Sequence, residues 1–584
     1  MRAKRKNNII LIGFMGSGKT TVGKRLAAVM NREFLDTDER IEENEGMTIS
    51  RIFAEKGEAY FRETETQLIR RMIENEQGKI ISTGGGMPLR PENAALLKQL
   101  GLVVYLKSSE EAVYERLRDK TDRPLLAGPD PRRKIRELLE YREPLYSACA
   151  ELTLVTDGKM PEALVREIIE VQKSESAKLN RIKELCEIAS EHIRAKNIGC
   201  FAGMDKPLFM ISETYPGIWL EHVYDSVFYA KLEPGNAQLA KNTLNLFLDN
   251  QSEEGQLPCY VLNRGKNLTG YGDVVGYGQI QECVSFAALC LEVCVMTGDK
   301  EFLVKCYEAA KRWEGWLRKY RMTQNMGLVE MFCGFDTGHD NSARFEDISC
   351  KGNYRRDGVT MNASVMPPDD GITPIAAVDM NCNFYATEKA LEEMARLLDK
   401  PEEAAEWSRK AAEVKERLFA VCYDEDDCFF YDVDRNGRKR RYRSSTILHL
   451  FLEKVLDPKE DQELIAQIYT RYLHNPKEFW TEYPFPSMSV SDPSWKKHTQ
   501  SNCWGYFSQA LIALRCTRWM DAYGLERDFD QLCEKWVQAW TDGFETAAFG
   551  QELDPLTGIP SECSQWYSSC MLFYVYAVRR LGLV

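Results

Sequence analysis

The 584-residue sequence contains no apolar run of about 18 residues, so it predicts no membrane-spanning helix. The N-terminal segment is basic and then apolar, but the apolar run is short and enters a glycine loop, so we expect no signal peptide. Positive charge is not in excess, because 76 Lys and Arg stand against 89 Asp and Glu, a net charge of −13. This balance argues against nucleic acid or an anionic membrane surface as the main partner.

Regularly spaced cysteines are also missing. The 18 Cys include no C-x-x-C pair, so we expect neither a zinc site nor a disulfide framework, but buried free thiols in a reducing cytoplasm. The N-terminal part lacks Trp and His, since all 11 Trp lie between Trp219 and Trp566 and all six His lie at or after His192. The chain is several times longer than a typical domain of roughly 150 residues, which predicts two domains with different roles.

The first motif is a phosphate-binding loop. A short apolar strand at 8–12 leads into Gly13-x4-Gly18-Lys19-Thr20, and an amphipathic helix follows. In this pattern backbone N–H groups curl around phosphates, Lys19 reaches the β and γ oxygens, and the Thr20 hydroxyl ligates Mg²⁺. The sequence predicts an ATP site made of Gly13, Gly16, Ser17, Gly18, Lys19, Thr20 and Thr21.

Further short motifs follow in the order of a nucleoside-monophosphate-kinase-like fold. A second short strand ends at Asp36 and Asp38, which we expect to point toward the crevice at the carboxyl edge of a parallel sheet. Arg62 stands on a predicted helix. The three glycines at 84–86 follow another strand and present bare backbone to a ligand.

Two more arginines complete this set, Arg123 in a polar, proline-containing stretch typical of a mobile lid and Arg142 near the end of a helix. Over the first 170 or so residues the chain resembles shikimate kinase. The resemblance implies that Asp36 accompanies Mg²⁺, that Asp38 binds the shikimate hydroxyls as general base, and that Arg123 closes on the transferring phosphates. The shikimate-binding residues it implies are Asp38, Arg62, Gly84, Gly85, Gly86 and Arg142, with the two arginines clamping the carboxylate.

The chemistry agrees with this resemblance. Phosphoryl transfer needs positioning and charge neutralisation, which Lys19, Mg²⁺ and Arg123 supply. Two arginines bind a carboxylate with bidentate geometry that lysine lacks. The expected product is 3-phosphoshikimate, in aromatic amino-acid synthesis. A rival within the class is another small-molecule kinase such as gluconate kinase. A degenerate kinase that serves as a nucleotide-sensing scaffold is a third interpretation, which the complete residue set disfavours.

The rest of the chain is mostly helical by pattern, without the short repeats of a solenoid. We expect an α/β P-loop kinase at 1–172, a linker or first barrel helix at 173–198, and an all-α, double-layered toroid at 199–584. Helical spacing of apolar residues predicts helices near 236–251, 281–297, 300–319, 382–398, 402–419, 459–473, 502–522, 526–541 and 564–581.

The segments between these helices are rich in aromatic and acidic residues. Their order resembles the trehalase-like glycoside hydrolases with an (α/α)6 barrel, including glucosidase and mannosylglycerate-hydrolase relatives. In that resemblance the segment GHDNSARF carries the general acid, Asp340, and the segment VDMN places Asp379 and Asn381 near the sugar. Asp225 matches an acid of the substrate-facing rim, and Trp504 is a candidate for sugar binding.

The second carboxylate of such a site is less clear in the sequence. Inverting hydrolysis needs an acid and a base roughly 6.5–9.5 Å apart. In the family the base precedes a D-P-x-T-G turn, which is 554–558 here, and the usual base position holds Gln551. Either the register shifts so that Glu552 is the base, or the barrel lacks a normal base, with Glu562 as a weaker substitute.

Two functions follow from these observations. The first is a fused enzyme in which an ATP- and Mg²⁺-dependent shikimate kinase is joined to an inverting hydrolase of a small glycoside. The alternative keeps the kinase and makes the barrel a non-catalytic carbohydrate-binding or regulatory module, which Gln551 motivates. We expect small-molecule substrates, no nucleic acid, no membrane and a cytoplasmic location.

Overall fold

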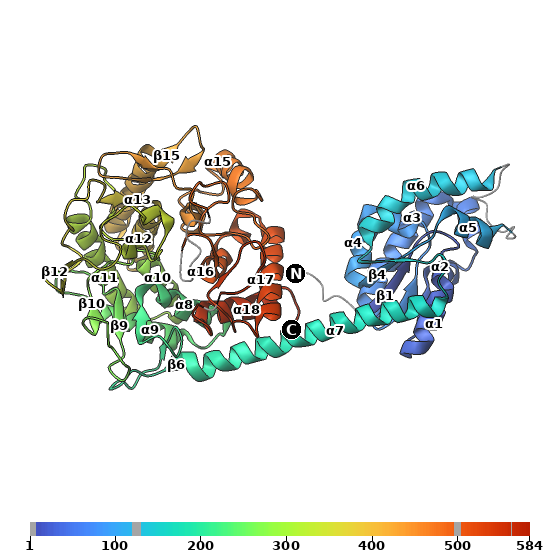
Figure 1. The fold of residues 1–584 in the computed structure, drawn as a ribbon, viewed down its shortest axis with the longest axis horizontal. Helices are drawn as coiled ribbons and strands as arrows, with labels where there is room; N and C mark the ends of the chain where they lie inside the picture. The colour runs from blue at the N-terminus through green and yellow to red at the C-terminus, as the bar shows by residue number, and fades with distance from the viewer. Residues whose placement is uncertain (1–6, 119–129, 496–503, 562) are drawn as a thin grey trace. The chain divides into compact units, whose positions relative to one another are not determined.

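The computed structural model describes residues 7–118, 130–495, 504–561 and 563–584 of the chain (Figure 1). It divides into two compact units, Met1–Arg181 with Leu583 and Ile182–Gly582 with Val584. The division falls within helix α7 (Pro161–His192). The first unit has an α/β fold, and the second is mainly helical.

A parallel sheet forms the centre of the first unit. Its strand order is β2-β3-β1-β4-β5, and every neighbouring pair is parallel. The carboxyl ends of the strands therefore meet at one edge, where the loops after β1, β2 and β3 can share a ligand. The strands are β1 (Asn8–Ile12), β2 (Phe34–Asp36), β3 (Ile80–Ser82), β4 (Gly101–Lys107) and β5 (Leu152–Val155).

Alternate residues of β1 belong to two separate apolar cores, because successive side chains of a strand point to opposite faces. Ile9 and Leu11 pack with α1 and α7, whereas Ile10 and Ile12 pack with α3, α4 and α6. Covering both faces makes all of β1 buried. The helices are α1 (Lys19–Met30), α2 (Thr37–Glu45), α3 (Ile49–Asn75), α4 (Pro91–Leu100), α5 (Glu110–Leu117) and α6 (Pro131–Cys149), with a 3-10 turn η1 (Met87–Leu89).

One detail differs from the expectation for this unit. Strand β2 ends at Asp36, and Asp38 lies in the first turn of α2 instead of at a strand end. The Asp36 carboxylate accepts a hydrogen bond from the Asp38 N–H at 3.0 Å and so caps the helix. Because of this cap the strand ends at Asp36, two residues before the end at Asp38 that the sequence pattern predicts.

The second unit is a ring of inner helices surrounded by outer helices, as predicted (Figure 1). Helix α16 packs against α18, α18 against α8, α8 against α10, α10 against α12, and α12 against α14, so the contacts follow the ring from α16 to α14. The inner helices are α8 (Val223–Leu232), α10 (Phe286–Thr297), α12 (Val378–Leu397), α14 (His449–Leu452), α16 (Ala510–Arg515) and α18 (Ser568–Arg580).

The outer helices alternate with the inner ones along the chain and bury one face each. They are α9 (Ala237–Leu248), α11 (Lys300–Tyr320), α13 (Pro401–Cys422), α15 (Gln462–Ile468) and α17 (Glu526–Gly543). Short strands and turns join the helices. The strands are β6 (Ile198–Gly199), β7 (Leu208–Phe209), β8 (Gly217–Trp219), β9 (Tyr260–Leu262), β10 (Val275–Gly276), β11 (Glu330–Met331), β12 (Arg355–Arg356), β13 (Val359–Thr360), β14 (Ile375–Ala376), β15 (Tyr423–Asp424), β16 (Phe429–Phe430), β17 (Asp432–Val433), β18 (Lys439–Arg440), β19 (Ser508–Gln509) and β20 (Glu552–Leu553).

Two stretches of the barrel differ from the predicted helices. The sequence pattern predicted a loop where helix α8 lies. The helix is apolar on nearly all sides, so its sequence lacks the 3.6-residue alternation of apolar and polar residues that marks a surface helix. Within 502–522, where one helix was expected, the described residues contain the strand β19, the short α16 and two 3-10 turns. Ser508 and Gln509 pair with β20, so their backbone N–H and C=O groups are used in the sheet and cannot extend helix α16 toward its N-terminus.

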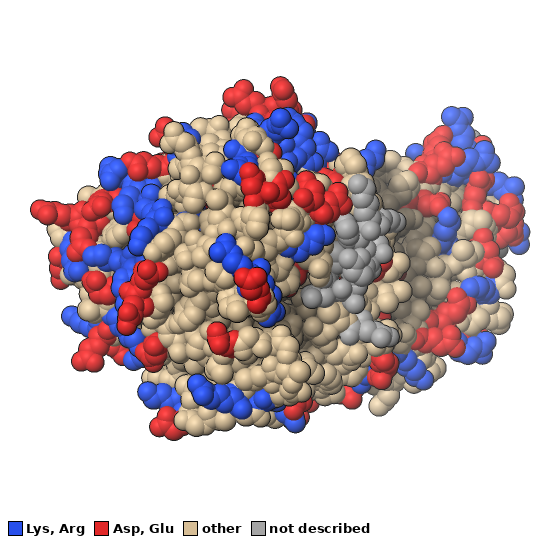
Figure 2. Space-filling view, turned by 60° about the vertical axis from the view of Figure 1, so that its left-hand side comes forward, with Lys and Arg blue, Asp and Glu red and all other residues tan. Residues whose placement is uncertain are grey.

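The surface carries charges of both signs. On the face drawn in Figure 2, Lys and Arg side chains lie among Asp and Glu side chains. Exposed helices carry ion pairs such as Arg409 with Glu413 and Arg133 with Glu137. Within the described part of the chain, no helix combines the length and the apolar character needed to cross a membrane.

Candidate active sites

The loop between β1 and α1 has a backbone that glycine adopts most easily. Gly13, Gly16 and Gly18 have φ angles of 146°, 77° and 94°. Lys19 Nζ donates hydrogen bonds to the carbonyl oxygens of Gly13 at 2.9 Å and Phe14 at 3.0 Å. The ammonium therefore lies over the loop that the sequence predicts to hold phosphates.

The two predicted metal-binding residues meet at the start of α1. Thr20 Oγ1 donates a hydrogen bond to Asp36 Oδ2 at 3.3 Å. Thr20 and Thr21 are exposed, whereas Ser17 is buried and its Oγ has no hydrogen-bond partner among the described residues. A hydroxyl and a carboxylate oxygen are thus placed beside the phosphate loop.

The glycines after β3 make room for the predicted substrate-binding residues. A Cβ on Gly84 would overlap the Asp38 carboxylate, and a Cβ on Gly86 would overlap the Arg62 guanidinium. The Gly84 N–H donates to Thr37 Oγ1 at 2.9 Å, which joins the ends of β2 and β3. Asp38 and Arg62 therefore both contact the glycine loop, from α2 and α3.

Helix α6 brings the second predicted arginine to the same place. Arg142 is largely buried, and its guanidinium lies 5.5 Å from the centre of the Phe14 ring, next to the phosphate loop. One turn further on, the Tyr146 hydroxyl donates to the Gly85 carbonyl oxygen at 2.5 Å. Arg123 lies outside the described residues.

Sequence reasoning gave no role to Glu65, which belongs to this group. Its Oε2 accepts from Arg62 Nη1 at 2.9 Å, while its buried Oε1 has no hydrogen-bond partner among the described residues. Burial raises the pKa of Glu65 to about 7, Arg62 opposes the rise and the Asp38 charge adds to it. Its position three residues after Arg62 on a helix was the available signal.

In the barrel, Asp340 lies between two 3-10 turns, η5 (Gly334–Thr337) and η6 (Ala343–Phe345). Its backbone carbonyl accepts from the Trp504 N–H at 3.2 Å. Burial raises the pKa of the Asp340 carboxyl to about 7, and the negative charge of Glu221 contributes to this rise. Burial and the Glu221 charge therefore favour the protonated form of the predicted acid.

Arg344 fixes the loop of Asp340 to the barrel core. Its guanidinium bonds both oxygens of Asp379 at 2.8 and 3.0 Å and both oxygens of Asp432 at 2.9 and 3.2 Å. Burial alone raises the pKa of Asp379, but Arg344 outweighs it and holds that pKa well below its ordinary value. The structure thus places Asp379 on Arg344, at the start of α12.

The remaining predicted sugar residues are also enclosed. The Trp504 ring stacks on His339 with centres 4.0 Å apart and an angle of 13°. The Asn381 side chain bonds backbone groups of Val329 and Ala377. Asp225 is fully buried and accepts from the hydroxyls of Ser568 and Ser569.

Near the D-P-x-T-G turn, Glu552 and Gln551 are both buried. Glu552 Oε2 accepts from Gln509 Nε2 at 2.8 Å and its Oε1 accepts from Ser561 Oγ at 2.9 Å. Gln551 Oε1 has no hydrogen-bond partner among the described residues. Glu562 lies outside the described residues.

Sequence reasoning also missed Glu221, in the turn η4 (Leu220–His222) before α8. Its Oε2 lies 3.1 Å from the place that a Cβ on Gly338 would take, two residues before Asp340. Burial raises the pKa of Glu221 to about 7, Arg515 lowers it and Asp225 raises it. Two carboxyl groups with raised pKa values thus belong to one site, a pattern typical of catalytic acid–base pairs.

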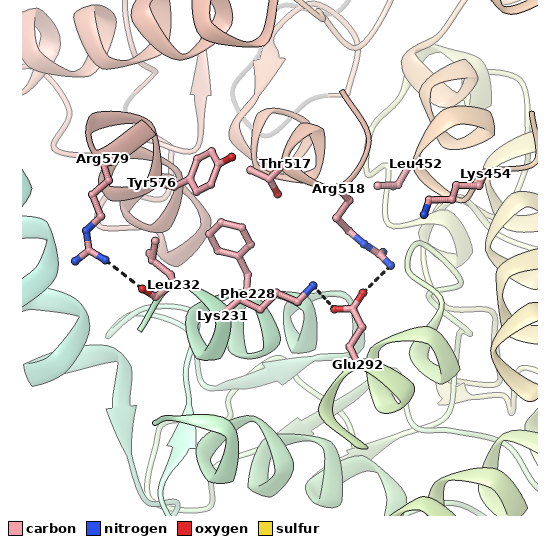
Figure 3. Close-up of a pocket in the computed structure, with 10 residues that line it drawn as sticks. All are labelled: Phe228, Lys231, Leu232, Glu292, Leu452, Lys454, Thr517, Arg518, Tyr576 and Arg579. Carbon is pink, nitrogen blue, oxygen red and sulfur yellow. Dashed lines mark hydrogen bonds and ion pairs between the residues drawn. The ribbon is translucent and has the colours of Figure 1, made fainter. Parts of the chain in front are cut away.

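A cavity of about 520 Å³ lies near the C-terminal ends of the inner helices α8 and α18, whereas Glu221 lies before the N-terminal end of α8 (Figure 3). Its lining comes from the C-terminal halves of α8 and α18, from Glu292 of α10, and from residues at or just after the ends of α14 and α16. Glu292 accepts from Arg518 Nη2 at 2.9 Å and lies 2.6 Å from Lys231 Nζ. Burial raises the pKa of Glu292, but Arg518 and Lys231 outweigh it and hold the pKa below its ordinary value. The lining residues are Phe228, Lys231, Leu232, Glu292, Leu452, Lys454, Thr517, Arg518, Tyr576 and Arg579.

The folds and sites define the class of each unit. A phosphate loop with an acid and two arginines at the carboxyl edge of a parallel sheet is a P-loop small-molecule kinase. A double ring of alternating inner and outer helices, with two buried carboxyl groups at one end, has the architecture of an (α/α)6 barrel.

Comparison with known proteins gives the particular families. Residues 15–173 match the model of the shikimate kinase family, and residues 219–568 match the mannosylglycerate hydrolase MGH1-like glycoside hydrolase domain. Over 162 residues the chain is 45% identical to the shikimate kinase of Thermodesulfovibrio yellowstonii, covering 28% of this chain and 92% of that protein. The chain therefore belongs to the shikimate kinase family through its first unit and to the MGH1-like glycoside hydrolase family through its second.

Solved structures agree with the fold of the second unit. The GH63 mannosylglycerate hydrolase from Thermus thermophilus, in complex with glucose, is similar to this chain with a TM-score of 0.52 and 17% identity. The similarity covers 68% of this chain and 99% of that one. The same enzyme in complex with Tris and D-glycerate has a TM-score of 0.52 and 17% identity, covering 67% of this chain and 99% of that one. Both enzymatic classes predicted from the sequence are confirmed, and the kinase family implies ATP as phosphate donor.

Proposed function

We propose that the first unit transfers the γ-phosphoryl group of ATP to the 3-hydroxyl of shikimate, giving 3-phosphoshikimate and ADP. The observation that carries this proposal is that Asp38 and Arg62 both contact the glycine loop after β3. An acid that binds hydroxyls beside a guanidinium that binds a carboxylate suits an anionic polyol.

The residues at the phosphate loop also fit a magnesium ion. Mg²⁺ prefers oxygen ligands, and Thr20 Oγ1 and Asp36 Oδ2 lie 3.3 Å apart there. Bound Mg²⁺ would neutralise charge on the phosphates. Lys19 adds positive charge, Asp38 orients the hydroxyl and accepts its proton, and Arg62 and Arg142 hold the carboxylate. For Arg123 we propose closure on the transferring phosphates.

A coupled assay of ADP release tests the kinase proposal. We expect release that requires ATP, Mg²⁺ and shikimate, that is abolished by Lys19→Ala and that Asp38→Asn lowers by about 10²–10⁴-fold. Gluconate in place of shikimate tests the rival kinase. ADP release at the same rate with and without shikimate would contradict the substrate.

For the second unit we propose inverting hydrolysis of a small glycoside, with Asp340 as general acid. A general acid must hold a proton near neutral pH, and the raised pKa of about 7 at the buried Asp340 carboxyl meets this need. Asp225, Asp379, Asn381 and Trp504 are proposed to shape the sugar site, and Glu552 is the base that the sequence motif favours.

A panel of glycosides tests this proposal. Because solved relatives were obtained with glucose and D-glycerate, α-glucosides and α-mannosides of glycerate come first, followed by small α-linked glucosides. We expect turnover that Asp340→Asn abolishes for unactivated glycosides. Gln551 favours a second candidate, a carbohydrate-binding barrel, for which the panel would give sugar binding without turnover and no effect of Asp340→Asn.

We also propose domain limits of 1–172 and 199–584, with 173–198 as the connecting segment, and a cytoplasmic location. Every cysteine that the structure describes is free, which is typical of a reducing compartment.

A further inference from the structure

We propose that Glu221 is the general base of the barrel, the carboxylate that activates water for attack on the sugar. This inference rests on the proposed hydrolysis with Asp340 as acid. It assigns the second carboxyl group to a residue outside the D-P-x-T-G motif.

The first argument is the position of Glu221 beside the loop of Asp340. Glu221 Oε2 lies 3.1 Å from the place of a Cβ on Gly338. Two residues of chain span at most about 7 Å, so Gly338 keeps Asp340 close to Glu221. The spacing leaves room for the roughly 6.5–9.5 Å that inverting enzymes place between acid and base.

The second argument is that the Glu221 carboxyl group has no short hydrogen bond from a nitrogen and can accept one from water, whereas both oxygens of Glu552 already accept side-chain hydrogen bonds. The closest polar neighbours of Glu221 are His222 Nδ1 at 3.6 Å, Cys283 Sγ at 3.7 Å and Arg515 Nη2 at 3.7 Å. The two nitrogen contacts are longer than ordinary hydrogen bonds, and thiols donate weakly. The Glu221 side chain is 12% exposed, which leaves an oxygen for a water molecule.

The alternative bases lack this freedom. Glu552 is 0% exposed, and each of its oxygens already accepts a hydrogen bond from a side chain. Gln551, at the position usual for the base, carries an amide that cannot take up the proton of water. Glu221 is thus the described carboxylate near Asp340 that can meet a water molecule without losing strong partners.

The third argument is that the Arg515 guanidinium lies 3.7 Å from Glu221 Oε2, where its positive charge favours the ionised form of that carboxyl group. Side chains on a helix tilt toward its N-terminus, so Arg515 at the end of α16 reaches back toward Glu221. Its Nε and Nη2 have no hydrogen-bond partner among the described residues, so its charge acts on Glu221 without competition from a tighter ion pair there. The titratable or charged groups around Glu221 are His222, Asp225, Cys283, Asp340, Arg515, Tyr215 and Tyr567.

The charges around the pair favour the protonated form of Asp340 and the ionised form of Glu221. Burial raises the pKa of both carboxyl groups, but Arg515 lowers that of Glu221, while the Glu221 charge raises that of Asp340. This division matches the needs of an acid and a base in one site.

The reaction then balances. Glu221 accepts a proton from water as the water oxygen forms a bond to the anomeric carbon. The bond from that carbon to the leaving oxygen breaks, and Asp340 donates its proton to this oxygen. Exchange with solvent returns the proton from Glu221 and restores Asp340.

Glycosyl fluorides separate the two roles, because fluoride leaves without protonation. With the full chain and α-glucosyl and α-mannosyl fluoride, we expect Asp340→Asn to retain turnover and Glu221→Ala to lose at least about 100-fold in rate. Sodium azide should restore the Glu221→Ala reaction and give the β-glycosyl azide, identified by NMR. Glu413→Gln, on the exposed surface of α13, is the control and should keep its rate.

The outcomes separate failure of this inference from failure of the proposed function. Lack of turnover by the unaltered chain on every fluoride and glycoside would overturn the proposed hydrolysis itself. Turnover that survives Glu221→Ala, or that Glu552→Gln abolishes, would overturn only the base assignment. Tryptophan fluorescence during unfolding reports on the barrel alone, since all Trp lie at or after Trp219. Glu221→Gln is the second variant, with a matched shape, if Glu221→Ala fails to fold.

Discussion

The Asp38 carboxylate lies directly against the α-carbon of Gly84, so that a side chain at Gly84 would occupy the place of the carboxylate. This contact joins the loop after β2 to the loop after β3, two segments that are far apart in the sequence. The Asp38 carboxylate is therefore positioned by a residue that has no side chain.

Gly84→Ala should weaken the kinase through this contact. The added methyl group displaces the Asp38 carboxylate, so we expect kcat to fall by about 10²-fold or more, because general-base catalysis contributes about 10²–10⁴-fold. Steady-state kinetics with shikimate measure the change. Gly315→Ala in the barrel is the control, because its Cβ would meet nothing within 4 Å and its φ lies outside the left-handed region. An unchanged kcat in Gly84→Ala would contradict the role of the contact.

Glu65→Gln should change substrate binding more than chemistry. The substitution removes the charge that holds Arg62 Nη1 at 2.9 Å, so the guanidinium loses its fixed direction toward the substrate carboxylate. We expect KM for shikimate to rise while kcat changes less. The split between KM and kcat checks this, and an equal fall of kcat at unchanged KM would oppose it.

Arg344→Lys should destabilise the barrel. Lysine cannot bond two carboxylates with bidentate geometry, and leaving Asp379 or Asp432 buried without its partner costs about 3–5 kcal/mol. Chemical unfolding followed by Trp fluorescence measures the loss. Arg409→Ala, in an exposed pair with Glu413, should cost no more than about 1 kcal/mol. Equal losses in both variants would refute this account.

Glu282→Gln should reduce the pH dependence of barrel stability. Burial raises the pKa of Glu282 from 4.5 to about 8, so the fold favours its neutral form. Its contribution to stability is complete below about pH 4.5 and is lost as the pH rises through about 8. The Glu282→Gln variant, which is uncharged at this position, should lose less stability between about pH 5 and pH 8 in the same fluorescence assay. Parallel curves for the two proteins would argue against the shift.

Arg515→Met should move the acidic limb of the pH profile of hydrolysis. Arg515 lowers the pKa of Glu221, so its removal raises that pKa and the base becomes ionised only at higher pH. We therefore expect the lower limb of kcat/KM to shift toward higher pH. Arg579→Met, which removes a cation at the opposite end of the barrel, should leave the profile in place. An unmoved acidic limb in Arg515→Met would show that Arg515 does not set the ionisation of the base.

Several residues proposed for the kinase site could be located from the sequence, because they follow strands directly. Asp36 and the glycines at 84–86 each stand within a few residues of a buried strand end, and parallel strands bring such positions together. Glu65 was missed because its role comes from Arg62 and from burial, and neither contact nor burial is visible in a motif.

The barrel site was predictable only in part, because its contacts join distant segments. Asp340 could be found from its own motif, but Glu221 meets Gly338 across more than 100 residues. Helix α8, which follows Glu221, is apolar on nearly every side, so its sequence shows no 3.6-residue alternation of apolar and polar residues. The partners of Asp225 and Arg344 likewise come from other parts of the ring.

The ion pairs of Arg344 make the position of Asp340 independent of the exposed residues of the barrel. Its bonds to Asp379 and Asp432 tie the loop of Asp340 to α12 and β17, inside the protein. The position of Asp340, the proposed acid, is thus set by buried ion pairs and not by exposed residues. Substitutions at exposed positions of the ring can therefore accumulate without displacing Asp340.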